Sequence, residues 1–323
     1  KRRRREVSVC LVVHFGATSI TYGTGIASTS NLDRRVPTDI AMLHRDIEAA
    51  GEEVRSQGGM VHSVYIGGGT PTTLSAGDLY DLLKKSRSVF PLKHKAELTV
   101  EAGRPDTITL EKLQAIKSGG ANRISVNPQS MSDPVLRAMG RAHSADDTQN
   151  AYALARNVGF SAINMDLIAE LPTDDASGFA HSLEQVLTLS PENITVHTLA
   201  LKRGAALKDT QHTLPEGAEV SRMLDFAWEH LREEGYLPYY LYRQKFTSGS
   251  FENVGWTKPG FVSEYNICMM EELHTVLSLG AGGVSKSVQY AEGIIRRQSN
   301  PKYPQEYIRD GDRIILDKQQ FTP

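Results

Sequence analysis

Glycines and polar side chains occur where four successive strand-like segments of the sequence end. The second segment runs into Gly67-Gly68-Gly69, the third ends at Glu101, the fourth is followed by Gln129, and the fifth carries Asp166. A buried carboxylate is costly unless something pairs with it, so this pattern favours a ligand site over isolated polar groups in a core. Two carboxyl groups in one site could also act as a general acid and a general base.

The glycine run allows the backbone to approach a ligand closely, with its N–H groups free to hold a carboxylate or phosphate. It matches neither the Gly-Lys-Ser/Thr phosphate loop nor the Gly-x-Gly-x-x-Gly dinucleotide pattern, and a tight turn is the alternative interpretation. Gly280 to Val284 is a second place of close approach or a simple bend. His197, on the sixth segment, is of a type that is more often structural than a ligand.

Aromatic and basic residues lie close together in the tail of the chain, at Tyr239, Tyr240, Tyr242, Arg243 and Lys245. Flat ring faces combined with positive charge suit a large, planar, polyanionic ligand. A half-exposed strand with solvated charges explains the same spacing. The tail therefore indicates a ligand surface without establishing one.

Six β-strand and α-helix units in a row must position these residues. Short apolar, β-branched segments alternate with amphipathic helical patterns, and nearly continuous apolar strands are typical of a parallel sheet covered on both faces. The pattern predicts a βα barrel or a doubly wound sheet, with the chemistry at the carboxyl ends of the strands. The expected strands are 7–15, 62–66, 98–100, 123–126, 162–167 and 194–198.

Helix boundaries follow from capping residues. Ser75 is expected to begin one helix, Ser144 with Asp147 resembles a capping box, and Gly159 is expected to end the helix that follows. After residue 201 the rhythm is lost, and only one long helix, with Val220 to Leu231 on its apolar side, is clear. We therefore predict a basic end at 1–6, a barrel at 7–204, and a C-terminal α+β extension at 205–323 that covers the site.

Composition excludes several classes of protein. Among 323 residues, 36 are basic and 38 acidic, a net charge of 36 − 38 = −2, which argues against a nucleic-acid-coating protein. Two cysteines, Cys10 and Cys268, exclude a disulfide-rich scaffold and an all-cysteine zinc site. No apolar run approaches the roughly 18 residues that span a bilayer, and the start lacks a signal-peptide core. We expect a cytoplasmic protein with no nucleic-acid partner and no membrane span.

Taken together, the motifs resemble the radical S-adenosylmethionine (SAM) enzymes of the oxygen-independent coproporphyrinogen III oxidase type, especially the coproporphyrinogen dehydrogenase branch. The resemblance covers most of the chain from Val7 to about Ser287, in the family's order. It is carried by Tyr65 to Thr72, Glu101 to Asp106, Arg123 to Gln129, Asn164 to Ile168, Val196 to Ala200, Pro238 to Lys245, Glu252 to Gly255 and Tyr265 to Ile267.

The resemblance implies a partial, six-unit, TIM-like βα barrel with a C-terminal extension. Its SAM contacts, carried over by motif, are Gly68, Gly69 and Thr70 at the methionine part, Glu101 beside them, and Gln129, Arg141, Asp166, Ala200 and Val284 at the nucleoside or at a second cofactor. The candidate tetrapyrrole contacts are Arg203, Tyr240, Arg243 and Lys245.

The family reaction removes the carboxyl groups of two propionates on a reduced tetrapyrrole, yielding protoporphyrinogen IX. A 5′-deoxyadenosyl radical abstracts hydrogen, carbon dioxide leaves, and a separate electron donor serves the reaction. In the family, a Cys-x-x-x-Cys-x-x-Cys loop after the first strand holds a [4Fe–4S] cluster. Aligning the strand places Gly16, Ile20 and Gly23 at those positions, and none of them can ligate iron.

Three hypotheses follow. The first is a coproporphyrinogen-oxidase-like radical SAM protein, disabled by loss of the cluster ligands. The second is a cluster-free carrier, chaperone or pseudoenzyme that binds haem, another tetrapyrrole or SAM. The third, an ordinary barrel enzyme using Glu101 and Asp166 as acid and base, lacks any sequence feature that would supply its substrate.

Overall fold

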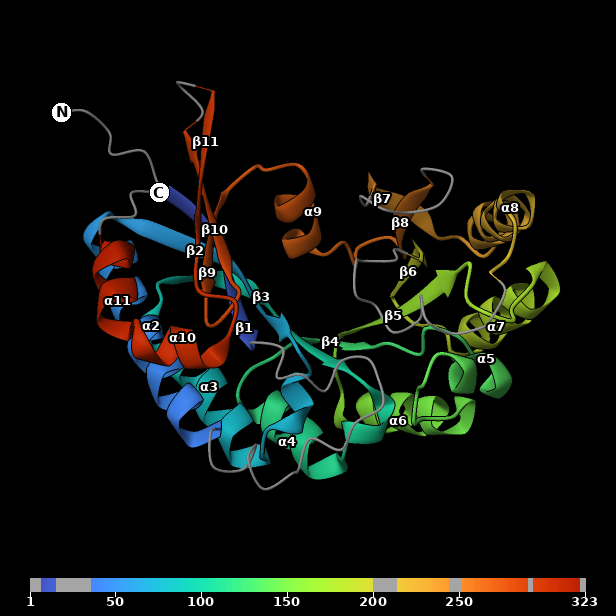
Figure 1. Cartoon of the computed structure of the whole chain (residues 1–323), viewed down its shortest axis with the longest axis horizontal. Helices are drawn as coiled ribbons and strands as arrows, with labels where there is room; N and C mark the ends of the chain where they lie inside the picture. The colour runs from blue at the N-terminus through green and yellow to red at the C-terminus, as the bar shows by residue number, and fades with distance from the viewer. Residues whose placement is uncertain (1–6, 16–35, 200–213, 244–250, 290–292, 320–323) are drawn as a thin grey trace.

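The computed structural model describes residues 7–15, 36–199, 214–243, 251–289 and 293–319 (Figure 1). The strands are β1 (Val7–Phe15), β2 (Gly59–Gly68), β3 (Leu92–Gly103), β4 (Arg123–Val126), β5 (Ala162–Ala169), β6 (Asn193–Thr198), β7 (Leu237–Arg243), β8 (Glu252–Thr257), β9 (Thr275–Leu279), β10 (Val284–Gln289) and β11 (Ile294–Ser299). The helices are α2 (Val36–Ser56), α3 (Ala76–Val89), α4 (Leu110–Ser118), α5 (Asp133–Ala138), α6 (Ala145–Val158), α7 (Ala176–Leu189), α8 (Gly217–Glu233), α9 (Glu264–Met270), α10 (Pro304–Arg309) and α11 (Gly311–Gln319).

All described strands belong to one sheet, in the order β11-β10-β9-β1-β2-β3-β4-β5-β6-β8-β7. Neighbours from β1 to β6 are parallel, as crossover helices require, and this confirms the α/β class and the six βα units. The sheet is curved (Figure 1), and the parallel strands bring residues at their carboxyl ends together along one edge.

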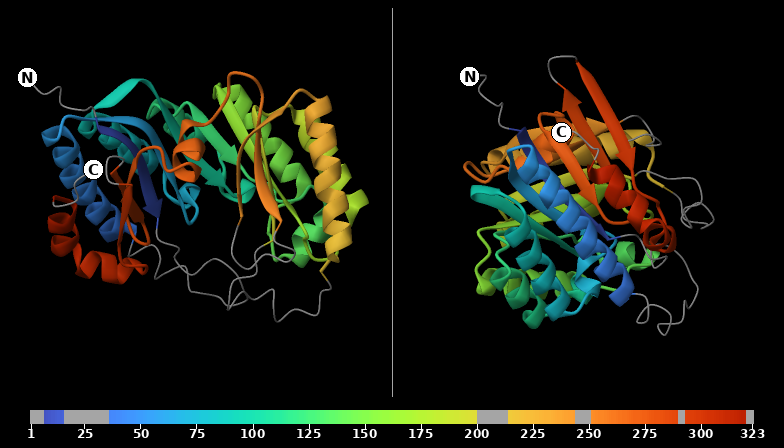
Figure 2. Two further views of the ribbon diagram at one scale, coloured as in Figure 1. Left: turned by 90° about the horizontal axis from the view of Figure 1, so that it is seen from above. Right: turned by 90° about the vertical axis from the view of Figure 1, so that its left-hand side faces the viewer.

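The C-terminal strands join both ends of this sheet. β9 adds in parallel beside β1, whereas β8 pairs antiparallel with β6 and β7 with β8. In Figure 2 the red C-terminal helices pack at one end of the sheet, beside α2, and the yellow α8 lies at the other. The predicted boundary between 204 and 205 falls outside the described residues, so that division of the chain stays a prediction.

Local signals account for the helix boundaries. The Ser75 hydroxyl accepts the Asp78 N–H at the start of α3, and Ser144 and Asp147 form the expected capping box at α6. Gly159 ends α6 with φ of 87°, a left-handed conformation that suits glycine. The three capping predictions are confirmed. These caps define where α3 and α6 begin and where α6 ends.

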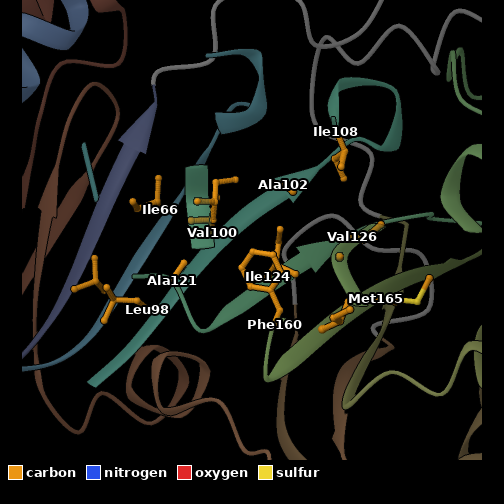
Figure 3. Packing of buried hydrophobic residues seen from close by; sticks show 14 of the residues in the cluster. Ile66, Leu98, Val100, Ala102, Ile108, Ala121, Ile124, Val126, Phe160 and Met165 are labelled. Carbon is orange, nitrogen blue, oxygen red and sulfur yellow. The ribbon is translucent and has the colours of Figure 1, made fainter. Parts of the chain in front are cut away.

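The core lies between the sheet and the helices α2, α3, α4, α6 and α7 on its outer face (Figures 1 and 3). Alternate strand residues, including Val100, Ile124 and Met165, are fully or almost fully buried there. Since side chains alternate across a strand, the residues between them point to the opposite, concave face. The cover helix α9 lies on that concave side, and it packs on β2 and β7.

Candidate functional site

The concave face of the sheet is polar, where an ordinary barrel interior would be filled by branched apolar side chains. Alternate residues of β3, β5 and β6, such as Thr99, Asp166 and His197, border a partly open cavity of about 170 Å³. We call this cavity the chamber. Its other walls are Tyr65, Arg123, Ile124, Ser125, Asn164, Thr195, Tyr239, Tyr240, Tyr242, Ser263, Asn266 and Met270.

Glu101 lies against the glycine run at the end of β2. Its carboxylate accepts hydrogen bonds from the Tyr65 hydroxyl and the Gly68 N–H. A Cβ at Gly67 would lie 2.3 Å from Tyr65 Cε1 and 2.6 Å from Glu101 Oε2, so only glycine leaves room here. Gly68 has φ of 102°, which side chains rarely adopt. The structure therefore brings together Gly68 and Glu101, two of the predicted SAM contacts, with Gly69 and Thr70 directly following.

The two predicted carboxyl groups have opposite pKa shifts. Burial, reinforced by the nearby charge of Asp166, raises the pKa of Glu101 to about 7. Burial also opposes ionisation of Asp166, but His197, together with hydrogen bonds from Asn164 and Thr195, lowers its pKa overall. At neutral pH Asp166 is therefore ionised, whereas Glu101 is partly protonated. Asp166 can accept a proton or hydrogen bond, and Glu101 can donate a proton.

A polar chain crosses the chamber from β5 to β7. The Asn164 amide donates to Asp166 Oδ1 at 2.7 Å, and His197 Nε2 lies 3.6 Å from Asp166 Oδ2. His197 Nδ1 is 3.2 Å from the Tyr242 hydroxyl. Sequence reasoning gave His197 little weight and did not single out Asn164. Asn164 lies two residues before Asp166, and His197 lies two residues after Thr195, so the members of each pair share a strand face. This spacing was the signal that could have identified them.

Gln129 extends β4 toward Asp166. Its φ of 69° turns the backbone so that its N–H donates to the Asp166 carbonyl, and its own carbonyl accepts the Ile168 N–H, both at 2.9 Å. A non-glycine residue in the left-handed region costs about 1 to 3 kcal/mol unless its surroundings compensate. The structure thus places the predicted residues Gln129 and Asp166 side by side.

The cover helix α9 closes the chamber over β2. The ring of Tyr265 stacks on Tyr65 with centroids 4.0 Å apart and planes 12° from parallel. One residue further, the Asn266 amide donates to the Tyr239 hydroxyl at 2.7 Å. Neither tyrosine of the stack was predicted as a site residue.

Other predicted contacts lie elsewhere. Arg243 is mostly exposed, pairs with Glu252 at 3.0 Å, and borders an outer groove beside Trp228, away from the chamber that contains Tyr240. Arg141 lies between α5 and α6, and Val284, 40% exposed, begins β10. The predicted residues Ala200, Arg203 and Lys245, and positions 16, 20 and 23, lie outside the described residues.

The residues present do not fit an iron–sulfur cluster. The aligned positions Gly16, Ile20 and Gly23 offer no sulfur, and Cys10 and Cys268 are both buried and share one small apolar cluster. Across the described ranges, no three His, Cys, Asp or Glu side chains gather as metal ligands. No helix in those ranges is long and apolar enough to cross a membrane.

Comparisons with known proteins agree with this geometry. The Radical SAM superfamily model matches residues 25–185. The chain is 40% identical over 310 residues to the oxygen-independent coproporphyrinogen-III oxidase-like protein HemZ of Bacillus subtilis, covering 95% of this chain and 62% of HemZ. The haem chaperone HemW of Escherichia coli is 26% identical, over 86% of this chain and 70% of HemW.

A solved structure shares the fold. The coproporphyrinogen III oxidase HemN of Escherichia coli superposes with a TM-score of 0.72 at 21% identity, over 97% of this chain and 70% of HemN. The chain thus spans less than two thirds of HemZ and somewhat more of HemN and HemW.

Proposed function

Because the chain belongs to the coproporphyrinogen-oxidase-like family of radical SAM proteins, associated with haem biosynthesis, we propose that the glycine run with Glu101 and the adjoining chamber bind SAM and a tetrapyrrole. We further propose that the polypeptide with this sequence does not carry out the family's radical reaction. Each part of the proposal depends on different residues.

The placement of Glu101 at the glycine run is the observation that carries SAM binding. A carboxylate beside a glycine run complements an amino acid, because the carboxylate attracts the ammonium group while N–H groups of the loop that follows Gly68 would receive the amino acid's own carboxylate. The bare Gly67 leaves a space that any Cβ would fill. Asp166, ionised and oriented by Asn164, is available to accept hydrogen bonds from ribose hydroxyls. SAM, when bound, contributes its sulfonium and adenosine groups to the site.

The tyrosines of β7 support tetrapyrrole binding. Tyr240 and Tyr242 stand nearly parallel, 12° apart, at the chamber wall. Planar aromatic walls suit a planar macrocycle. The names of the relatives HemZ, HemN and HemW agree with a ligand of this class. Arg203, Arg243 and Lys245 remain proposed contacts for its carboxylates.

We propose that the protein lacks the family's radical activity because positions 16, 20 and 23 carry no sulfur. Without thiolates, the open-iron site on which the family's chemistry depends cannot be assembled. A cluster-free haem carrier is the second candidate, favoured by the similarity to HemW.

Anaerobic reconstitution followed by iron and acid-labile sulfide analysis separates these possibilities. We expect no stoichiometric cluster in this chain, and one in the triple variant Gly16→Cys, Ile20→Cys, Gly23→Cys. A cluster in the unmodified chain would refute the proposed lack of radical activity. Haem titration of the cluster-free protein, followed in the visible spectrum, tests the carrier hypothesis, which predicts saturable binding that Tyr240→Ala weakens.

A further inference from the structure

We propose that Glu97 is a positioning residue that holds the cover helix α9 in place and, through it, orients Glu101. The inference deepens the proposed function, since it concerns how the same site is organised. It relies on that function only for the identity of the ligand.

Glu97 lies on β3, and its side chain meets the beginning of α9. Its Oε1 accepts the Ser263 hydroxyl at 2.8 Å and the Tyr265 N–H at 3.3 Å, and its Oε2 accepts the Glu264 N–H at 2.9 Å. The first N–H groups of a helix have no partner within the helix, so a carboxylate there satisfies them and also complements the helix dipole. Glu97 thus caps α9 from a different part of the chain.

Burial makes this contact strong. Glu97 is 7% exposed, and Arg123, 3.5 Å away, is its charge partner on the neighbouring strand β4. Arg123 is itself held by the Asn193 side chain and the Phe261 carbonyl. Hydrogen bonds to a charged acceptor are worth more than neutral ones, especially away from water. The described part of the chain therefore anchors α9 at its first turn.

Two contacts in series connect the position of α9 to Glu101. Tyr265, whose N–H Glu97 accepts, stacks on the ring of Tyr65. Tyr65 donates its hydroxyl hydrogen bond to Glu101. If α9 moves, the Tyr65 ring loses the surface that fixes its plane, and Glu101 loses a donor that stabilises its ionised form.

Titration of Glu101 reports this coupling without any ligand. The groups facing Glu101 are Tyr65 of β2, Asp166 of β5, His197 of β6, and Tyr265 of α9, with the Gly68 N–H. Of these groups, Tyr265 belongs to α9 and Tyr65 stacks on it, and Tyr65 is the one that donates a hydrogen bond to Glu101. Loss of its hydrogen bond should move the Glu101 midpoint to higher pH.

The experiment uses the whole chain with ¹³C-labelled glutamate carboxyl groups, and Glu101→Gln assigns the resonance. Glu97→Gln keeps the shape of the side chain but removes the charge. Ser263→Ala leaves both N–H contacts of Glu97 and removes the hydroxyl that donates to Glu97 and accepts the Asn266 N–H in the first turn of α9. Asp46→Asn is the control, because Asp46 is also buried and also accepts an N–H, that of Gly280, but far from the chamber in the α2 and α10 contact.

In Glu97→Gln we expect hydrogen exchange in residues 263–271 to accelerate roughly tenfold or more, as expected for losing hydrogen bonds to a charged acceptor. The Glu101 midpoint should rise, SAM affinity should fall, and Ser263→Ala should change each in the same direction by less. Asp46→Asn should change none of them. Faster exchange in α9 with an unchanged Glu101 midpoint would overturn the inference, as would equal effects of Asp46→Asn. If the unmodified chain fails to bind SAM, the proposed function fails, while exchange and titration still decide the role of Glu97.

Discussion

Tyr240 lies flat across the backbone of Gly255, so close that a Cβ on Gly255 would be 1.8 Å from Tyr240 Cε1. Gly255 is on β8, between β6 and β7 in the sheet. Because Gly255 has no side chain, Tyr240 reaches over β8 and its hydroxyl comes within 3.3 Å of Thr195 on β6. This crossing places the tyrosine rings at the chamber wall.

Gly255→Ala should displace the Tyr240 ring from the chamber. Forcing an extra methyl group into a packed site costs about 1 to 3 kcal/mol, and the loss should appear as a lower midpoint in urea unfolding. Tetrapyrrole affinity should fall as well. In the double variant Gly255→Ala, Tyr240→Ala, stability should recover toward that of Tyr240→Ala alone. Additive losses in the double variant would argue against the contact.

Gly67→Ala should weaken SAM binding by at least about tenfold, or about 1.4 kcal/mol. The new methyl group would displace Tyr65 or the Glu101 carboxylate, both of which lie within 2.6 Å of it. Gly77→Ala is the matched control, because its nearest neighbour is the Ser75 hydroxyl at 3.7 Å and it lies in helix α3. The control should bind SAM normally and gain about 0.5 to 1 kcal/mol of stability. Calorimetric titration of both variants checks this.

SAM affinity should increase as the pH rises through about 7, because the Glu101 carboxylate that attracts the ammonium group forms in that range. Glu101→Gln should bind more weakly and lose this pH dependence. Binding isotherms between pH 5.5 and 8.5, with Asp166→Asn as a comparison, test the assignment. A wild-type affinity that is flat over this range would contradict it.

The same shift affects stability. The folded-state pKa of Glu101, about 7, exceeds its ordinary value of 4.5, so the folded protein holds the proton more tightly than the unfolded chain. This contribution is fully present below pH 4.5 and is lost as the pH rises toward 7. The free energy of unfolding of Glu101→Gln should therefore decline less steeply than that of the unmodified chain over this window, as measured by urea titrations.

The two thiols should be unreactive in the native state. Cys10 and Cys268 are buried in one cluster, at 0% and 4% exposure. The hydrogen bond that the Cys268 thiol donates to Cys10, together with burial, raises the pKa of Cys268. A thiol-specific chromogenic reagent should label neither in the folded protein and both after denaturation. Rapid native labelling of either cysteine would contradict the described packing.

The strands were predictable because their apolar runs are short, β-branched and regularly spaced. β1 and β4 occur as expected, while β2 and β3 extend further than expected, through polar residues such as Glu97 whose alternation with core residues was not used. Glu101 and Asp166 were found because a carboxyl group at a strand end is conspicuous. The roles of Tyr65 and Tyr265 depend on α9 folding back onto β2, a long-range contact that local periodicity does not encode.

The tail illustrates the same limit. The aromatic and basic residues from Tyr239 to Lys245 suggested one ligand surface, but Tyr242 and Arg243 are consecutive and lie on opposite faces of β7, so Tyr242 borders the chamber and Arg243 the outer groove. Which face of β7 borders the chamber depends on where β7 lies in the sheet. Its partner, β8, follows β7 in the chain but lies between β7 and β6 in the sheet.

The most direct test of the account is calorimetric titration of the purified, iron-free chain with SAM, alongside Gly67→Ala. We expect saturable binding by the unmodified chain, without any cluster, and at least about tenfold weaker binding by the variant. Absence of binding by the unmodified chain, or equal binding by both, would contradict the assignment of the chamber.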